Sequence, residues 1–227
     1  MIGKILRTIF DWSEVWSLFI PLAVLMLRKP NSKWITPLKW YLLCALILNL
    51  TIDFYWYVNK YRLFGSRPGH NRWNNNIYYN LHSAARLLFF SWFFITQSIS
   101  FKKIARIIIV AFLLFNMVLF SFFKNIFVIS SFTLAAEAGL LLILCLLYTY
   151  KIINDKLPDL NKLYPSFWVI GGLTLYTSVN FFLFLFYNYL IKNYNKFSVN
   201  VWDLHNGLFI LLCLSISIAF YYESKRK

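Results

Sequence analysis

Residues 80–90 read NLHSAARLLFF, and this stretch decides the fold class. It begins with polar residues, turns apolar, and belongs to a longer apolar stretch at 77–97. At helical spacing, His82 and Arg86 lie one turn apart on the same face. Ionisable side chains inside membrane helices usually face the interior of a bundle. The stretch therefore predicts a membrane span that carries an imidazole and a guanidinium into a helical bundle.

The composition supports a membrane location for the whole chain. Its 227 residues are 60% hydrophobic, 21% aromatic and 14% charged, whereas soluble domains are roughly 45–50% apolar and about 25% charged. A net charge of +15 would indicate nucleic-acid binding in a soluble protein. Here the basic residues lie between apolar stretches, where they orient a chain in the bilayer and contact anionic headgroups. We expect an integral membrane protein with no nucleic-acid partner.

Seven stretches are candidates for the roughly 20 apolar residues that a transmembrane helix needs. They lie at 13–28, 38–58, 77–97, 104–122, 126–150, 166–190 and 200–222. We predict an all-α integral membrane bundle of seven transmembrane helices over 13–222. An amphipathic segment at 1–12 precedes it in the membrane interface, and a basic cytoplasmic tail at 223–227 follows it. The longest predicted loop is 59–76.

The distribution of basic residues predicts the orientation. Seven spans place the two termini on opposite sides, with nine basic residues on the N-terminal side and thirteen on the C-terminal side. The twenty-third basic residue, Arg86, lies inside a span. Because cytoplasmic loops carry the excess of Lys and Arg, we place the N-terminus outside and the C-terminus in the cytoplasm.

Polar residues inside the predicted spans are the candidate site. With this orientation they fall into one layer towards the outer half of the bundle. An arginine in lipid needs a carboxylate, so we expect Arg86 to pair with Glu137 or Asp53. The pair either locks the bundle or borders an outward-facing pocket for a small anionic ligand or a lipid headgroup. The predicted cluster comprises Asp53, His82, Arg86, Glu137, Asn180, Asp203, His205 and Asn206.

Small residues predict where helices approach closely. Ser131, Ala135 and Gly139 repeat at four-residue spacing, and such ridges let a second helix pack against the backbone. Gly171 and Gly172 have the same potential in the sixth span. We favour close packing within one bundle over a dimer interface.

The sequence contains no recognisable catalytic motif. It has neither HExxH nor HxxxH, no GxSxG, and no lysine within the last span to hold retinal. The three cysteines have no CxxC spacing. We therefore predict no catalytic residues, no metal and no cofactor. An intramembrane metal hydrolase is kept as an alternative, because His82, His205 and either Asp53 or Asp203 supply three ligand types that bind zinc.

Two further stretches carry a resemblance. They are PSFWVIGGLTLYTSVNFFLFLFYNYL at 165–190 and VWDLHNGLFILLCL at 201–214. The chain resembles small standalone seven-helix bacterial membrane proteins and is similar to the membrane sensor portions that precede some bacterial histidine kinases. The resemblance implies a sensory or accessory role in the bacterial cytoplasmic (inner) membrane. The sequence has no kinase output domain, so we expect any signal to pass to a membrane or signalling protein partner.

The leading hypothesis is a non-enzymatic, receptor-like sensor or accessory module with a polar pocket that opens outward. A small-solute or lipid transporter is a second hypothesis, since exporters built from parallel repeats of three helices exist. The sequence shows no repeat between its first three and last three spans.

Overall fold

Every regular element in the described part of the chain is an α-helix. The computed structural model describes residues 2–61, 76–98, 101–123, 131–154, 160–193 and 197–226. The helices are α1 (Ile2–Asp11), α2 (Ser13–Arg28), α3 (Ile35–Tyr61), α4 (Asn76–Gln97), α5 (Phe101–Phe123), α6 (Ser131–Asn154), α7 (Leu160–Leu185), α8 (Tyr187–Asn193) and α9 (Phe197–Ser224).

The length and composition of four helices indicate a membrane protein. Within the described residues, four segments are long and apolar enough to cross a bilayer. They are Ile35–Phe54 in α3, Ser131–Asn154 in α6, Pro165–Leu185 in α7 and Val201–Ser224 in α9. The all-helical prediction is confirmed for the described residues, and four of the helices have the length and composition of membrane spans. The number of seven spans and their direction stay predictions.

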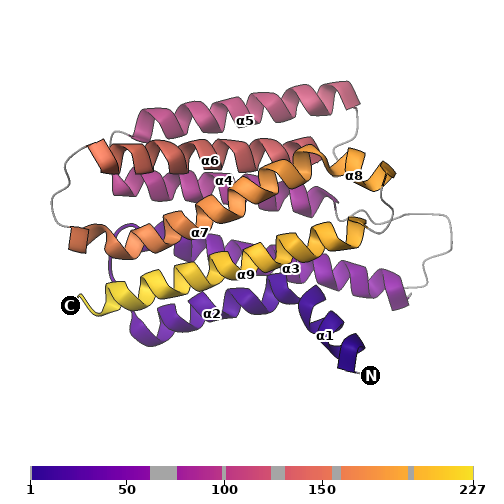
Figure 1. Ribbon diagram of the computed structural model, residues 1–227, viewed down its shortest axis with the longest axis horizontal. Coiled ribbons are helices and arrows are strands. Elements are labelled where there is room, and N and C mark those ends of the chain that lie inside the picture. Colours follow the sequence, from indigo (N-terminus) through magenta and orange to yellow (C-terminus); the bar gives the residue numbers. More distant parts are fainter. Residues whose placement is uncertain are drawn as a thin grey trace.

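Six long helices close a ring. Going round it, α2 packs on α3, α3 on α4, α4 on α6, α6 on α7, α7 on α9, and α9 returns to α2. Helix α5 lies outside this ring against α4 and α6, and Figure 1 shows it along one edge of the molecule. The N- and C-termini lie at opposite ends of the long axis (Figure 1). The ring gives the molecule an enclosed interior to which six helices contribute side chains.

Local signals explain where α2 ends. Lys29 takes the left-handed conformation with φ of 46°, and its N–H donates to the carbonyl of Leu25 at 3.0 Å. This is the usual closing bond of a helix, and Pro30 follows, which cannot continue one.

The predicted span at 166–190 differs from the structure at its end. Helix α7 begins earlier, at Leu160, and stops at Leu185, and the chain bends at Phe186 before α8. Neither glycine nor proline stands near the bend, so the sequence carries no breaker signal there. The N-terminal boundary predicted at 126 and most of the predicted loop 59–76 lie outside the described residues.

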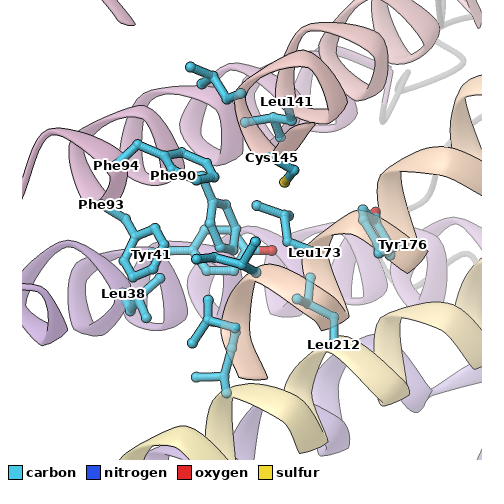
Figure 2. Packing of buried hydrophobic residues seen from close by; sticks show 14 of the residues in the cluster. Leu38, Tyr41, Phe90, Phe93, Phe94, Leu141, Cys145, Leu173, Tyr176 and Leu212 are labelled. Carbon is cyan, nitrogen blue, oxygen red and sulfur yellow. The ribbon is translucent and has the colours of Figure 1, made fainter. Parts of the chain in front are cut away.

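One half of the ring interior is apolar and tightly packed (Figure 2), and Tyr41 lies at its border, in contact with Phe90 on one side and His82 on the other. Figure 2 shows Tyr41, Phe90 and Phe93 meeting with Leu173 and Leu212 between the helices. Aromatic rings join α4 to neighbouring helices. The ring of Phe94 lies 5.6 Å from that of Tyr148, centre to centre, a separation typical of favourable aromatic pairs. Because lipid tails are as apolar as these side chains, such close contact is what holds membrane helices together.

Glycines allow α7 to pack closely against its two main neighbours, α6 and α9. A methyl group added at Gly172 would lie 2.5 Å from the Cβ of Ser215 in α9, so this contact requires glycine. At Gly139 in α6 the same methyl would meet the ring of Phe181 at 3.0 Å. Gly171 faces open space. Two of the three glycines singled out from the sequence therefore serve contacts within the bundle.

Candidate functional site: a buried polar cluster

Arg86 and Glu137 form an ion pair inside the ring, between α4 and α6. Their side chains are only 4% and 3% exposed. Arg86 Nε lies 2.5 Å from Glu137 Oε1, and Nη2 lies 3.1 Å from Oε2, so the carboxylate is held by two donors. Such two-point geometry is the strongest form of arginine recognition of a carboxylate. Arg86 thus pairs with Glu137, one of the two partners considered from the sequence.

Tyr176 completes the surroundings of the guanidinium. Arg86 Nη1 donates a hydrogen bond to the Tyr176 hydroxyl. The guanidinium carbon also lies 5.0 Å from the centre of the same ring, within the range of a cation–π contact. Helices α4, α6 and α7 are therefore tied at one point, and the buried positive charge has both a counter-ion and a polar neighbour.

A second set of polar contacts connects α2, α7 and α9. His205 Nδ1 lies 2.7 Å from Asn180 Oδ1, and His205 Nε2 lies 3.2 Å from Glu14 Oε1. The Asn180 amide nitrogen donates to the carbonyl of Tyr176 at 2.7 Å. Because Tyr176 also bonds Arg86, the two sets meet on one turn of α7.

His82 and Tyr41 are buried without complete hydrogen bonding. Their rings are stacked 6.3 Å apart and nearly parallel, and the edge of Phe209 faces His82 at 6.5 Å. Both residues are at least 94% buried. In the described part of the chain, neither His82 Nε2 nor the Tyr41 hydroxyl has a hydrogen-bond partner. Buried polar atoms are nearly always paired. Ten buried side-chain nitrogen and oxygen atoms in the described residues lack a hydrogen-bond partner, and these two lie on rings that are stacked on each other.

These residues constitute one polar cluster within the ring. Phe209 contacts both His82 and Tyr176, and Tyr176 contacts His205, with ring centres 5.6–6.5 Å apart. We use the name polar cluster for Glu14, Tyr41, His82, Arg86, Glu137, Tyr176, Asn180 and His205.

Asp203 and Asn206 contact the N-terminal helix instead. Arg7 of α1 bridges Asp11 at 2.9 Å and Asp203 at 2.7 Å, and the Asn206 amide lies 3.5 Å from the carbonyl of Phe10. The hydrogen bond to Asp203 is the main cause that raises the pKa of Arg7 above its usual value. These contacts dock α1 on the beginning of α9, beside the polar cluster.

Asp53 is half-buried and makes no hydrogen bond or ion pair with any described residue. One turn before it, Asn49 is buried, and its amide donates to the backbone carbonyl of Glu14 at 3.1 Å. Asp53 therefore lies beside the α2–α3 contact, and it is not the counter-ion of Arg86.

Three members of the polar cluster, Glu14, Tyr41 and Tyr176, are absent from the predicted cluster. Glu14 stands at the beginning of a predicted span, where a carboxylate is ordinarily at the interface and the favourable N-terminal end of a helix. Tyr41 lies in an apolar stretch with nothing in its neighbours to distinguish it from a core tyrosine. Only the ring closure of α2 and α3 against α4 and α9 brings these side chains to the cluster.

The described residues contain no group of three or more His, Cys, Asp and Glu side chains that could hold a metal ion. The metal hydrolase alternative thus has no supporting observation there. A groove of about 530 Å³ lies along α7 and α8, lined by Val179, Phe182, Leu183 and their neighbours. Its lining is apolar, so it is not the polar pocket expected from the sequence.

Comparison of the chain with protein families, curated proteins and solved structures finds no match. Function must therefore be argued from the cluster itself.

Proposed function

We propose that the chain is a non-enzymatic, receptor-like membrane protein that binds a small molecule beside His82 and Tyr41. One observation carries the proposal: two unpartnered polar groups, stacked on each other, lie buried next to a fully paired arginine. An unsatisfied buried polar group costs about 1–3 kcal/mol. A ligand that accepts from the Tyr41 hydroxyl and bonds His82 Nε2 would remove that cost.

The paired state of Arg86 restricts the ligand. Glu137 already neutralises the guanidinium with two hydrogen bonds. An anionic ligand would have to compete with a carboxylate held on the same protein, which is unfavourable in a low-dielectric interior. A neutral molecule, or the neutral part of a lipid headgroup, that both accepts and donates hydrogen bonds suits His82 and Tyr41 better.

We further propose that seven helices, α2 to α7 and α9, cross the cytoplasmic membrane of a bacterium, with the N-terminus outside. Supporting this, α5 exposes an apolar surface along its length, including Val110, Leu113 and Met117, which suits lipid. The polar cluster then lies towards the outer side, and the signal passes to a membrane or signalling protein partner.

Native mass spectrometry tests the ligand proposal. The wild-type protein, purified from its own membranes in mild detergent, is expected to carry a small-molecule or lipid adduct of defined mass. Tyr41→Phe keeps the ring and removes only the unpartnered hydroxyl, so the adduct should be lost. Tyr148→Phe is the matched control, because that buried tyrosine already lies 3.4 Å from Gln97 Oε1. A bare wild-type mass, or an adduct retained in all three proteins, would contradict the proposal.

Topology is tested separately with reporter fusions. A reporter active only in the cytoplasm should be active after Arg226 and inactive when fused before Arg7. Equal activity at both positions would exclude an odd number of spans.

A further inference from the structure

The contact between Glu14 and His205 has no part in the proposed binding of a ligand at His82 and Tyr41. Glu14 in α2 and His205 in α9 face each other at 3.2 Å, and both are largely enclosed, with side chains 20% and 6% exposed. His205 also contacts Asn180 of α7 at 2.7 Å. The orientation of the Asn180 side chain fixes the direction of the hydrogen bonds that His205 makes.

The amide of Asn180 has a fixed orientation. Its nitrogen donates to the carbonyl of Tyr176 one turn earlier, so its oxygen faces His205 Nδ1. An amide oxygen only accepts hydrogen bonds. His205 Nδ1 must therefore carry a proton and act as the donor.

The other ring nitrogen then faces a carboxylate. If His205 were neutral with its proton on Nδ1, Nε2 would present a lone pair to Glu14 Oε1, and the contact at 3.2 Å would be repulsive. A proton between the two atoms makes the contact favourable. The geometry thus requires one proton beyond those of a neutral imidazole and a carboxylate.

The charge balance of the interior leads to the same result. Arg86 and Glu137 cancel each other, which leaves the Glu14 carboxylate as an uncompensated negative charge in the cluster. Arg7 is bound to Asp11 and Asp203. Buried charge without a partner is strongly unfavourable. A proton on the Glu14–His205 pair brings the cluster to neutrality.

Ionisable groups from the neighbouring helices surround the pair. Those that interact with it electrostatically are Tyr41 and Asp53 of α3, Tyr79, His82 and Arg86 of α4, Tyr176 of α7, and Cys213 of α9. Arg7 of α1 is paired with Asp11 of α1 and Asp203 of α9, and Glu137 of α6 is paired with Arg86.

We propose that Glu14 and His205 form a proton-binding site that fastens α2 to α9 and makes the bundle respond to pH. The proton comes from water, and the bound state is an imidazolium with both ring nitrogens protonated, facing a carboxylate. When the proton leaves, Nε2 and Glu14 repel each other and the α2–α9 contact weakens. This inference does not depend on a ligand at His82 and Tyr41, and it stands or falls separately.

Histidine-selective nitrogen NMR tests the site directly, because the chain has only three histidines. The His205 signals are those missing from His205→Gln. In wild-type protein in micelles at neutral pH, both ring nitrogens of His205 are expected to be protonated. In Glu14→Gln the amide donates to Nε2, so one ring N–H is lost and Nδ1–H is retained. A neutral His205 in the wild type, or a ring unchanged by Glu14→Gln, would overturn the proposal.

Thermal unfolding supplies the second readout. As the pH is raised, the wild-type Tm should fall by about 2–4 °C when the Glu14–His205 pair loses its proton. The Tm of Glu14→Gln should stay constant over the same pH range. Glu223→Gln is the matched control: Glu223 bonds Ser32 where α9 meets the end of α2, and no histidine is involved. Its profile should follow that of the wild type. If the Tm of Glu14→Gln fell with rising pH as much as that of the wild type, the pair would not be the source of the pH response.

Discussion

The polar cluster and the apolar half of the ring interior hold the same helices together by different interactions. In α4, Arg86 bonds Glu137 and Tyr176, and two turns later Phe93 and Phe94 pack against other aromatic and apolar side chains. Helix α9 changes in the same way after His205. The apolar half is held by close contact, which needs no special partner. The polar half is held by few, directional contacts, each of which requires a specific residue on another helix.

The difference between the two halves indicates that the functional site lies in the polar cluster. Apolar packing tolerates replacement by other side chains of similar volume, whereas a buried ionic group destabilises the fold unless its partner is present. A membrane protein has little structural need for such groups, and in membranes they generally mark functional sites. The predictions below separate the two halves, beginning with the largest effect.

Arg86→Leu should have the largest effect on stability. It leaves the Glu137 carboxylate buried without a counter-ion, and breaking a buried ion pair costs about 3–5 kcal/mol. Arg86→Leu with Glu137→Leu should recover most of this loss, because no charge remains. Unfolding in mixed detergent micelles measures both. Equal instability of the single and double variants would show that packing, and not charge, holds this half.

Leu141→Ala probes the apolar half. Leu141 is fully buried in α6, and removing a buried leucine side chain costs about 2–5 kcal/mol through the cavity that it leaves. The ligand adduct should be unchanged. Ile143→Ala, two residues away at a surface position, is the control and should change the free energy of unfolding little. Loss of the adduct in Leu141→Ala would show that the two halves are not separate.

Gly172→Ala should have a smaller effect, at the α7–α9 contact. The added methyl would meet Ser215 at 2.5 Å, and overpacking typically costs about 1–3 kcal/mol. Gly171→Ala adds the same methyl to the next residue, where space is open, and should be neutral or slightly stabilising. If both variants behave alike, α7 and α9 do not approach each other as closely as described.

Tyr41→Phe should have the smallest effect on stability and a large effect on binding. It removes a buried hydroxyl that has no partner among the described residues, so the free energy of unfolding should stay within about 0.5 kcal/mol or rise. Tyr148→Phe breaks an existing contact and should cost about 1 kcal/mol. A larger loss in Tyr41→Phe than in Tyr148→Phe would mean that the Tyr41 hydroxyl has a structural partner.

The helices could be predicted from the sequence because apolar length is a strong signal. The predicted span 38–58 lies within Ile35–Tyr61, and 104–122 lies within Phe101–Phe123. The bend at Phe186 could not be predicted, since aromatic residues surround it and nothing there ordinarily ends a helix. Its position depends on how α7 and α8 pack against α9.

The candidate site was predictable only in part, for a physical reason. The cost of charge in lipid singles out Arg86 and demands a carboxylate, but spacing along the chain does not distinguish Glu137 from Asp53. The choice depends on α6, and not α3, supplying a carboxylate at the level of Arg86. Glu14 was missed because its place at a span end is an ordinary one for an acidic residue.

The most direct test of the account is an experimental structure of the wild-type protein in lipid nanodiscs made from its own membranes. We expect non-protein density within hydrogen-bonding distance of both His82 Nε2 and the Tyr41 hydroxyl, with Arg86 still bound to Glu137. If His82 and Tyr41 bond to protein groups and no such density lies beside them, the cluster is a structural lock and the ligand site does not exist.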